Sequence, residues 1–293
     1  MGAGAGVMLL LILLVLHYQG GRTQEIALKA RKTHLVERMH FSLAAASEAE
    51  KSAVLATTDQ DSQAFADQAR AATAEVERGR LALGQLLGGG AGQKQKDLLA
   101  RFSEFFVALQ RVDSELLALA VKNTNVKAYA LAFGPAAQAA EETDAALAHF
   151  LAKHATAGQR TLLTAAGAQA AVLRIESRLA PHIAEQSDRK MDEMEALMAG
   201  QDHEVRAAFD ALAAQTALRS DSDLAAAKSS YARFNETRTQ ILALSRENTN
   251  VRSLAMSLDQ KRKAMAMCQD ALSALQREIV GESTPQAAVH SPR

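Results

Sequence analysis

The sequence has little of several residue types that other classes of protein require. Among its 293 residues there is no Trp and there are only 4 Pro, and aromatic residues make up 4%. The single cysteine, Cys268, excludes an internal disulfide framework and a cysteine-rich zinc site, and is compatible with an oxidising or a reducing compartment. Alanine is abundant and β-branched residues are sparse. We therefore do not expect a large sheet or a barrel.

Net charge is also lacking, because Lys and Arg together number 33 and so do Asp and Glu. A neutral chain lacks the strong positive field of a general nucleic-acid-binding protein, so we expect no nucleic-acid partner. Hydrophobic residues, in contrast, make up 48% of the sequence. A chain of this length can bury a sizeable core, as one large domain or two small ones.

The amino terminus is the most apolar part of the chain. Residues 3–16 carry no charge, and residues 7–16 are an unbroken aliphatic run. Crossing a bilayer takes about 20 apolar residues, a length that this segment approaches. A signal peptide is a weaker interpretation, because no basic residue precedes the run and no Ala-x-Ala cleavage site follows it. We interpret residues 1–21 as a membrane segment.

The orientation of this segment stays open. No Lys or Arg precedes the aliphatic run, whereas Arg22, Lys29, Arg31 and Lys32 follow it. By itself the positive-inside tendency would leave the rest of the chain in the cytoplasm.

The remainder, from about Gln24 to Glu282, has helical periodicity almost throughout. Two seams are clear, and each has spacings of three and four residues. The first consists of Leu35, Met39, Ser42, Ala46, Ala49 and Ala53. The second consists of Phe102, Phe106, Leu109, Leu116 and Ala120. Turns are predicted at residues 57–61, 88–92 and 123–125, and a bend at Gly134-Pro135.

The pattern recurs along the chain. Asn123-Thr-Asn-Val126 reappears as Asn248-Thr-Asn-Val251, a shift of 125 residues. Farther upstream, Gln60-Asp61 matches Gln201-Asp202 at a shift of 141, which would make the first copy 16 residues longer around the glycine loop. A tandem duplication explains this recurrence. We predict an all-α fold with two tandem up-down antiparallel four-helix bundles, residues 22–156 and 157–282, and a disordered polar tail, residues 283–293.

Several stretches resemble the four-helix-bundle sensory domain of bacterial methyl-accepting chemotaxis receptors. They are Ala49-Glu-Lys-Ser-Ala-Val-Leu55, Phe65-Ala-Asp-Gln-Ala-Arg70 and the helix–Asn-Thr-Asn-Val–helix segments of both copies. The resemblance covers most of residues 25–280. It implies a sensory module at the bacterial inner membrane, with the bundles in the periplasm, that binds a small molecule or a binding protein and passes a helix displacement inward.

Further partners implied by the resemblance are a second copy of the chain or a partner receptor. The sequence departs from the family in carrying two bundles. It also has no second hydrophobic span after Ile279 and no cytoplasmic signalling coiled coil.

Three residues are the candidates for ligand binding. Asp113 lies at the missing step of the second seam, and Arg238 is its counterpart in the other copy. A charge at an apolar seam binds a ligand, fixes the register, or reaches the edge of the bundle as a solvated side chain. Tyr231 is expected in the core, with a hydroxyl that could contact a ligand.

Other polar residues favour structural interpretations. The asparagines of the two repeated turns could line a pocket, but capping and turn formation are favoured. His149 and His154 do not have the spacing of paired metal ligands, and Gly88–Lys94 breaks the order of a phosphate loop. We expect no metal, no cofactor and no enzymatic activity. The alternative function is a helical spacer or interaction protein at the membrane without a small ligand.

Overall fold

The computed structural model describes the backbone of residues 3–89 and 92–281 and the side chains of residues 23–89 and 92–281. Every regular element in these ranges is helical, and none is a strand, which confirms the all-α prediction. The helices are α1 (Ala3–Leu55), α2 (Asp59–Gly88), α3 (Gln93–Ala120), α4 (Thr124–Leu131), α5 (Ala137–Lys153), α6 (Gln159–Ala184), α7 (Asp188–Ala213), α8 (Ser222–Glu247), α9 (Thr249–Met256) and α10 (Arg262–Gly281). Two π-helical turns, η1 (Ala132–Ala136) and η2 (Ser257–Lys261), join α4 to α5 and α9 to α10.

The two ends of the chain were assigned special roles from the sequence. Among the residues with described side chains, no helix combines the length and the apolarity that a membrane span needs. The predicted membrane segment, residues 1–21, and the predicted tail, residues 283–293, lie outside those residues.

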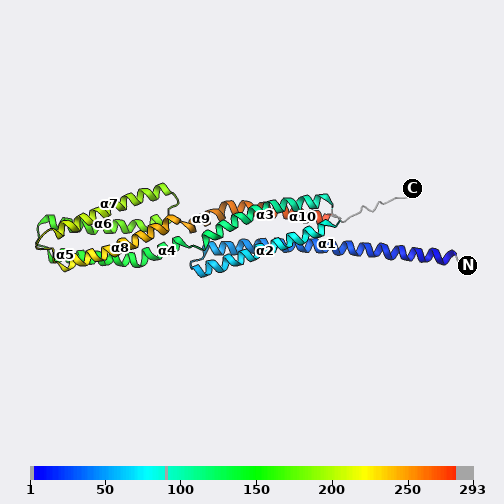
Figure 1. Ribbon diagram of the computed structural model, residues 1–293, viewed down its shortest axis with the longest axis horizontal. Coiled ribbons are helices and arrows are strands. Elements are labelled where there is room, and N and C mark those ends of the chain that lie inside the picture. Colours follow the sequence, from blue (N-terminus) through cyan, green and yellow to red (C-terminus); the bar gives the residue numbers. More distant parts are fainter. Residues whose placement is uncertain (1–2, 90–91, 282–293) are drawn as a thin grey trace, which may run out of the picture. The chain divides into compact units, whose positions relative to one another are not determined.

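The chain forms two compact units, which we call unit 1 and unit 2. Unit 1 contains α1, α2, α3 and α10 with η2, and unit 2 contains α4 to α8 with η1 and most of α9 (Figure 1). This division differs from the predicted ranges 22–156 and 157–282. Helix α5 of the first copy belongs to unit 2, and α10 of the second copy belongs to unit 1. The physical reason is that helical periodicity identifies a buried face but not the helix that covers it.

The core of unit 1 draws on four helical segments. Val36 and Met39 of α1, Val76 of α2, Phe102 of α3 and Leu272 of α10 lie in one apolar cluster. Gly79 of α2 allows a close approach, since a Cβ there would lie 2.6 Å from Met39 Cγ. The predicted seam of α3 is buried throughout.

The seam of α1 is partly different from the prediction. The structure buries Val36, Leu43 and Glu50 on this helix, and Ala49 only partly. The seam predicted from the sequence followed the small residues, and the observed buried face is rotated slightly from it.

The core of unit 2 draws on α5 to α8, with alanines of α4 and η1 at its margin. Leu147 of α5, Ile175 of α6, Val205 of α7 and Phe234 of α8 belong to one apolar cluster. Tyr231 lies beside Phe234, and its ring packs edge-on against Phe209.

The repeat seen in the sequence has a counterpart in the buried positions. The burial pattern of α1 and α2 recurs 129 residues later (188 − 59) in α6 and α7. From the middle of α3 onward the shift is 125 residues, and η1 and η2 obey it. The first copy is therefore longer by 4 residues (129 − 125), not by 16, and α2, with 30 residues, is longer than its counterpart α7, with 26. The bend predicted at Gly134-Pro135 is a π-helical turn.

Candidate functional site

Unit 1 contains a buried charge cluster, which we define as Glu50 of α1, Asp113 of α3 and Lys261 of η2. Glu50 is 1% exposed, Asp113 6% and Lys261 2%. The Lys261 ammonium donates a hydrogen bond to Asp113 Oδ1 and lies 3.7 Å from Glu50 Oε2. Lys261 is the last residue of a π-helical turn, a local irregularity that is frequent at functional sites.

The cluster is electrically unbalanced, because two carboxyl groups face one ammonium group. Burial raises the pKa of Glu50, and Lys261 opposes this change. Burial also raises the pKa of Asp113, again against the effect of Lys261. Among the described residues, neither carboxylate oxygen of Glu50 has a partner at hydrogen-bond geometry, although the Ser257 side chain is near enough to oppose the rise in pKa. Such a group is costly to bury in its charged form, so the cluster favours an additional positive charge or a proton.

A surface groove between α2 and α3 reaches this cluster. Its volume is about 520 Å³. The lining residues are Arg70, Thr73, Ala74, Glu77, Arg78, Gln110, Asp113, Ser114 and Leu117. Asp113 belongs to both the groove and the buried charge cluster, and among the described residues no hydrogen bond is made to its second oxygen, Oδ2. The groove therefore gives a small molecule access to a buried carboxylate.

Unit 2 brings the other two candidate residues together. The Tyr231 hydroxyl donates to Asp202 Oδ1 at 2.5 Å, and Arg238 Nη2 lies 3.8 Å from Asp202 Oδ2. Hydrogen bonding to Tyr231 and Arg206 outweighs burial and lowers the pKa of Asp202. Burial, with Asp202 nearby, raises the pKa of the Tyr231 phenol. Arg238 Nε and Nη1 are buried, and no described residue forms a hydrogen bond with them.

Asp113 and Arg238, although they occupy matching positions of the two copies, thus lie in separate polar centres. Asp113 pairs with Lys261 in unit 1, and Arg238 approaches Asp202 in unit 2. Asp113 is buried rather than extended to the bundle edge.

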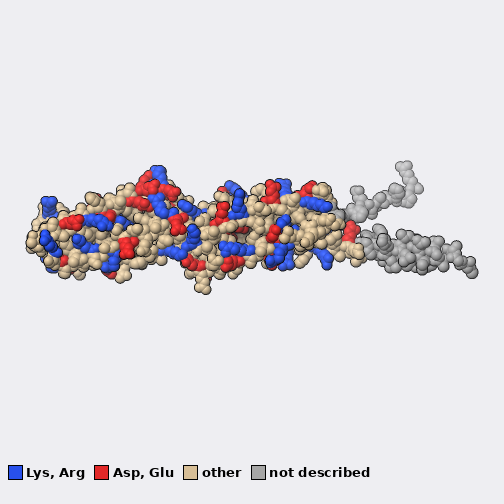
Figure 2. All heavy atoms as spheres, in the orientation of Figure 1, with Lys and Arg blue, Asp and Glu red and all other residues tan. Residues whose placement is uncertain are grey.

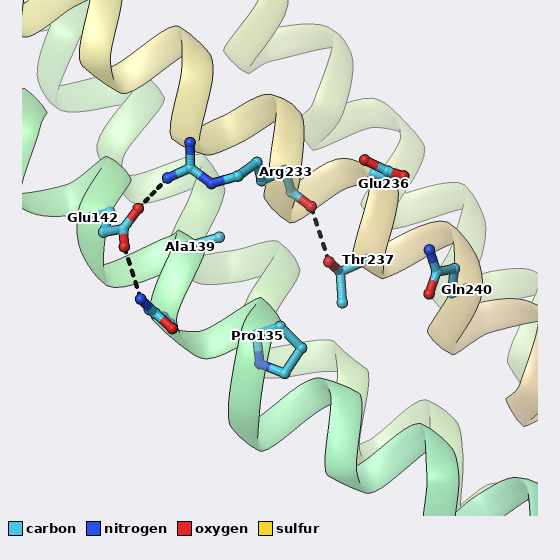
Figure 3. A pocket seen from close by; sticks show the side chains of 8 residues that line it. Pro135, Ala139, Glu142, Arg233, Glu236, Thr237 and Gln240 are labelled. Carbon is cyan, nitrogen blue, oxygen red and sulfur yellow. Dashed lines mark hydrogen bonds and ion pairs between the residues drawn. The ribbon is translucent and has the colours of Figure 1, made fainter.

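A second groove lies in unit 2 between η1, α5 and α8, with a volume of about 370 Å³. Figure 3 shows Arg233 of α8 reaching toward Glu142 of α5, with which it forms an ion pair. Gln138 also donates to Glu142, at 3.0 Å. Both charged residues are about half exposed, at 54% and 43% of the side chain. This groove presents solvated, mutually paired groups and is a weaker candidate.

The repeated Asn-Thr-Asn turns pair with each other inside unit 2. Thr124 N donates to Thr249 Oγ1 at 3.2 Å, and Thr249 N donates to Thr124 Oγ1 at 3.1 Å. The same exchange joins Asn125 and Asn250, with both distances 3.1 Å. Each chain segment therefore caps the helix that begins in the other, as in a two-fold interface.

The asparagine side chains of these turns are fully occupied. Asn125 Nδ2 donates to Ile183 O at 2.7 Å and to Asn248 Oδ1 at 2.8 Å. Asn250 Nδ2 donates to Asn123 Oδ1 at 3.0 Å. Asn123 and Asn248 are left-handed, with φ of 52° and 51°, a conformation that Asn tolerates. These residues act in turn formation and capping.

One histidine is part of the core beside these turns. His182 Nδ1 lies 2.8 Å from Ser245 Oγ, and its Nε2 lies 2.9 Å from Glu195 Oε1. Burial lowers the pKa of His182. Among the residues described, no group of three or more His, Cys, Asp or Glu side chains is arranged to hold a metal ion.

Sequence reasoning found Asp113 but missed its two partners. Lys261 stands in the run Lys261-Arg262-Lys263, which has the composition of a solvated face. Glu50 is flanked by Ala49 and Lys51, and the predicted seam passed through Ala49. The available signal was the spacing Val36, Met39, Leu43, Ala46 and Glu50, which places Glu50 on an apolar face.

On the face drawn in Figure 2, acidic and basic side chains are interspersed over the described parts of the chain. Neither protein-family models nor curated proteins match the chain. The candidate site therefore rests on its geometry.

Proposed function

We propose that the chain is a membrane-anchored, extracytoplasmic sensory module of the chemoreceptor type, located at the bacterial inner membrane with its helical units in the periplasm. Each unit would be an up-down antiparallel four-helix bundle. The module would bind a small molecule or a partner protein and convert binding into a displacement of helices. The proposal extends the resemblance noted in the sequence, and no catalytic step is part of it.

One observation carries the proposal: a buried, unbalanced charge cluster opens to a surface groove through Asp113. Three buried charges do not make a helical unit more stable than its apolar core alone would, because apolar residues of similar volume give the same or greater stability. Their retention beside a groove is expected of a site that recognises a ligand.

The placement of the cluster suggests how binding would move a helix. Glu50, Asp113 and Lys261 come from α1, α3 and η2, three different segments of unit 1. A ligand that pairs with Asp113 would weaken its bond to Lys261 and so change the contact that holds η2 against α3. Packed helices shift between discrete arrangements, which lets a local change in charge pairing alter helix position.

Thermal unfolding of the full chain with panels of organic acids, amino acids and amines would test the proposal. A ligand that binds only the folded chain raises the unfolding temperature by mass action. A concentration-dependent rise with any member supports the sensory role, and no rise with any of them counts against it.

The membrane anchor has a separate test. After expression of the full chain in bacteria, washing the membranes with alkaline carbonate should leave the protein in the pellet. Release into the supernatant would contradict an anchor at residues 1–21.

The alternative is a helical spacer or interaction protein without a small ligand. The observation that favours it is that the two Asn-Thr-Asn turns form hydrogen bonds with each other. These bonds make the helix ends rigid and leave the turns without an obvious role in binding a ligand. A chain that responds to no ligand in the thermal test but stays in the membrane would fit this alternative.

A further inference from the structure

We propose that the groove between α2 and α3 of unit 1 binds a small organic monoamine, with the ligand's ammonium group paired to Asp113. The inference rests on the proposed sensory function and names the ligand class of that same site.

The charge of the ligand follows from the buried charge cluster. Two carboxyl groups and one ammonium group sum to −1 when all three are ionised. A single additional positive charge makes the sum zero. Asp113 is the member of the cluster that lines the groove, and its Oδ2 accepts no hydrogen bond from the described residues. A ligand ammonium group donates readily to such an oxygen.

The rim of the groove adds no surplus negative charge to this sum. Arg70 pairs with Asp67 at 2.7 Å, and Arg80 pairs with Glu77 at 2.6 Å. Arg78 pairs with Glu75, which also pairs with Arg38 at 3.0 Å. These groups are four cations and three anions, so the rim offers no free carboxylate to a ligand with several positive charges. The ligand should be singly charged, which excludes polyamines.

The remaining walls define the rest of the ligand. Ala74 and Leu117 are apolar, and Thr73 uses its hydroxyl on Ala69 O at 3.0 Å. A short hydrocarbon body between α2 and α3 would lie against these groups while its ammonium group reaches Asp113.

Glu50 is the second ion-pair partner of Lys261 when a ligand occupies Asp113. Glu50 Oε2 lies 3.7 Å from Lys261 Nζ, and within the described part of the chain neither Glu50 oxygen has a partner at hydrogen-bond geometry. Lys261 is therefore shared between Glu50 and Asp113 when no ligand is bound. When a ligand ammonium group pairs with Asp113, Lys261 can move closer to Glu50, so that each carboxylate has a cation of its own.

Calorimetric titration of the full chain with n-butylammonium chloride tests this inference, with sodium butyrate as the probe of opposite charge. Saturable binding of the ammonium salt, and none of butyrate, is expected. Asp113→Asn should weaken butylammonium binding at least about tenfold. Glu115→Gln, which removes an exposed carboxylate from the same helix, should leave it unchanged.

A further variant separates binding from folding. Ala74 is exposed on the groove wall, so Ala74→Trp should block the groove without touching the buried charge cluster. Loss of binding with unchanged thermal unfolding supports the assignment. Undiminished binding by Asp113→Asn and Ala74→Trp would overturn it, as would no binding of butylammonium by the wild type. A response to organic acids but not to butylammonium would overturn the ligand class and leave the sensory function standing.

Discussion

At the residue scale, the buried charge cluster of unit 1 depends on Lys261. Its ammonium group is within ion-pair distance of both Glu50 and Asp113, and all three residues are almost fully buried. Removing one partner from a buried ion pair leaves an uncompensated charge in a poorly solvated place. Loss of any one member of the cluster should therefore be costly.

Lys261→Met should lower the free energy of unfolding by about 3–5 kcal/mol at neutral pH. The loss should be smaller in acid, because protonation of Glu50 and Asp113 removes the charges left without a partner. Urea unfolding at two pH values would measure both effects. Lys263→Met, in an exposed pair with Asp259, is the control and should cost less than about 1 kcal/mol. Equal losses in the two variants would contradict the importance of the buried cluster.

Glu50 should make stability depend on pH. Burial raises its pKa above the ordinary value of 4.5, so the folded chain retains a proton that the unfolded chain releases. The free energy of unfolding should therefore fall as pH rises above about 4.5, until the raised pKa is passed. Glu50→Gln should remove this fall, so its stability relative to the wild type should increase with pH.

Urea unfolding across acidic and neutral pH checks the Glu50 prediction. Glu48→Gln, an exposed position on the same helix, should give a curve parallel to that of the wild type. A parallel curve for Glu50→Gln would show that Glu50 is not held with a raised pKa.

At the element scale, the paired Asn-Thr-Asn turns fix where α4 and α9 begin. Each turn supplies side-chain acceptors to backbone N–H groups of the other, so neither helix start is complete alone. Helix starts need such acceptors because their first N–H groups have no partner within the helix.

Asn125→Ala should cost about 1–3 kcal/mol of unfolding free energy. The substitution leaves the Asn250 N–H and the Ile183 carbonyl without their partner and removes the bond to Asn248. Asn235→Ala is a matched control, because no described residue forms a hydrogen bond with the buried Asn235 Oδ1. This substitution should therefore lower the free energy of unfolding by less than Asn125→Ala does. Thermal unfolding measures both. A larger loss for Asn235→Ala would contradict the role given to the paired turns.

Much of the element level could be predicted from the sequence. The helix breaks at residues 56–58 and 121–123 lie close to the predicted turns at 57–61 and 123–125, and the buried seam of α3 follows from periodicity. The sequence placed Asp113 on this seam but did not decide between a buried position and the solvated edge. Glu50 and Lys261 could not be placed with it, because three- and four-residue spacings do not show which side chains from different helices meet.

At the scale of the whole molecule, the chain consists of two copies that exchange their last helices. Helices α1 to α3 of the first copy enclose a core with α10 of the second, and α6 to α8 enclose a core with α5 of the first. The repeat is visible in the sequence as the recurrence of Asn-Thr-Asn-Val. The exchange of α5 and α10 could not be predicted. The two helices have equivalent apolar faces, so the sequence pattern does not show which of the two cores each helix completes.

The exchange has a consequence for the proposed sensory role. Lys261, which completes the buried charge cluster, belongs to the second copy, whereas Glu50 and Asp113 belong to the first. The candidate site therefore requires both copies. A chain in which each copy folded on itself would lack Lys261 in this cluster, although the groove between α2 and α3 belongs to the first copy alone.

Distances between spin labels test the exchange most directly. Each of two label pairs would join helices from different copies. In unit 1 the labels would be at positions 29 and 280, where Lys29 Nζ lies 2.6 Å from Val280 O. In unit 2 they would be at positions 142 and 233, whose side chains form an ion pair. Cysteines would be introduced at each pair, with the buried Cys268 replaced by Ser. Packed helices lie about 8–10 Å apart, so both pairs should give narrow distributions within about 20 Å. Distributions centred beyond about 30 Å for both pairs, outside the width of one four-helix unit, would contradict the exchange and the charge cluster that depends on it.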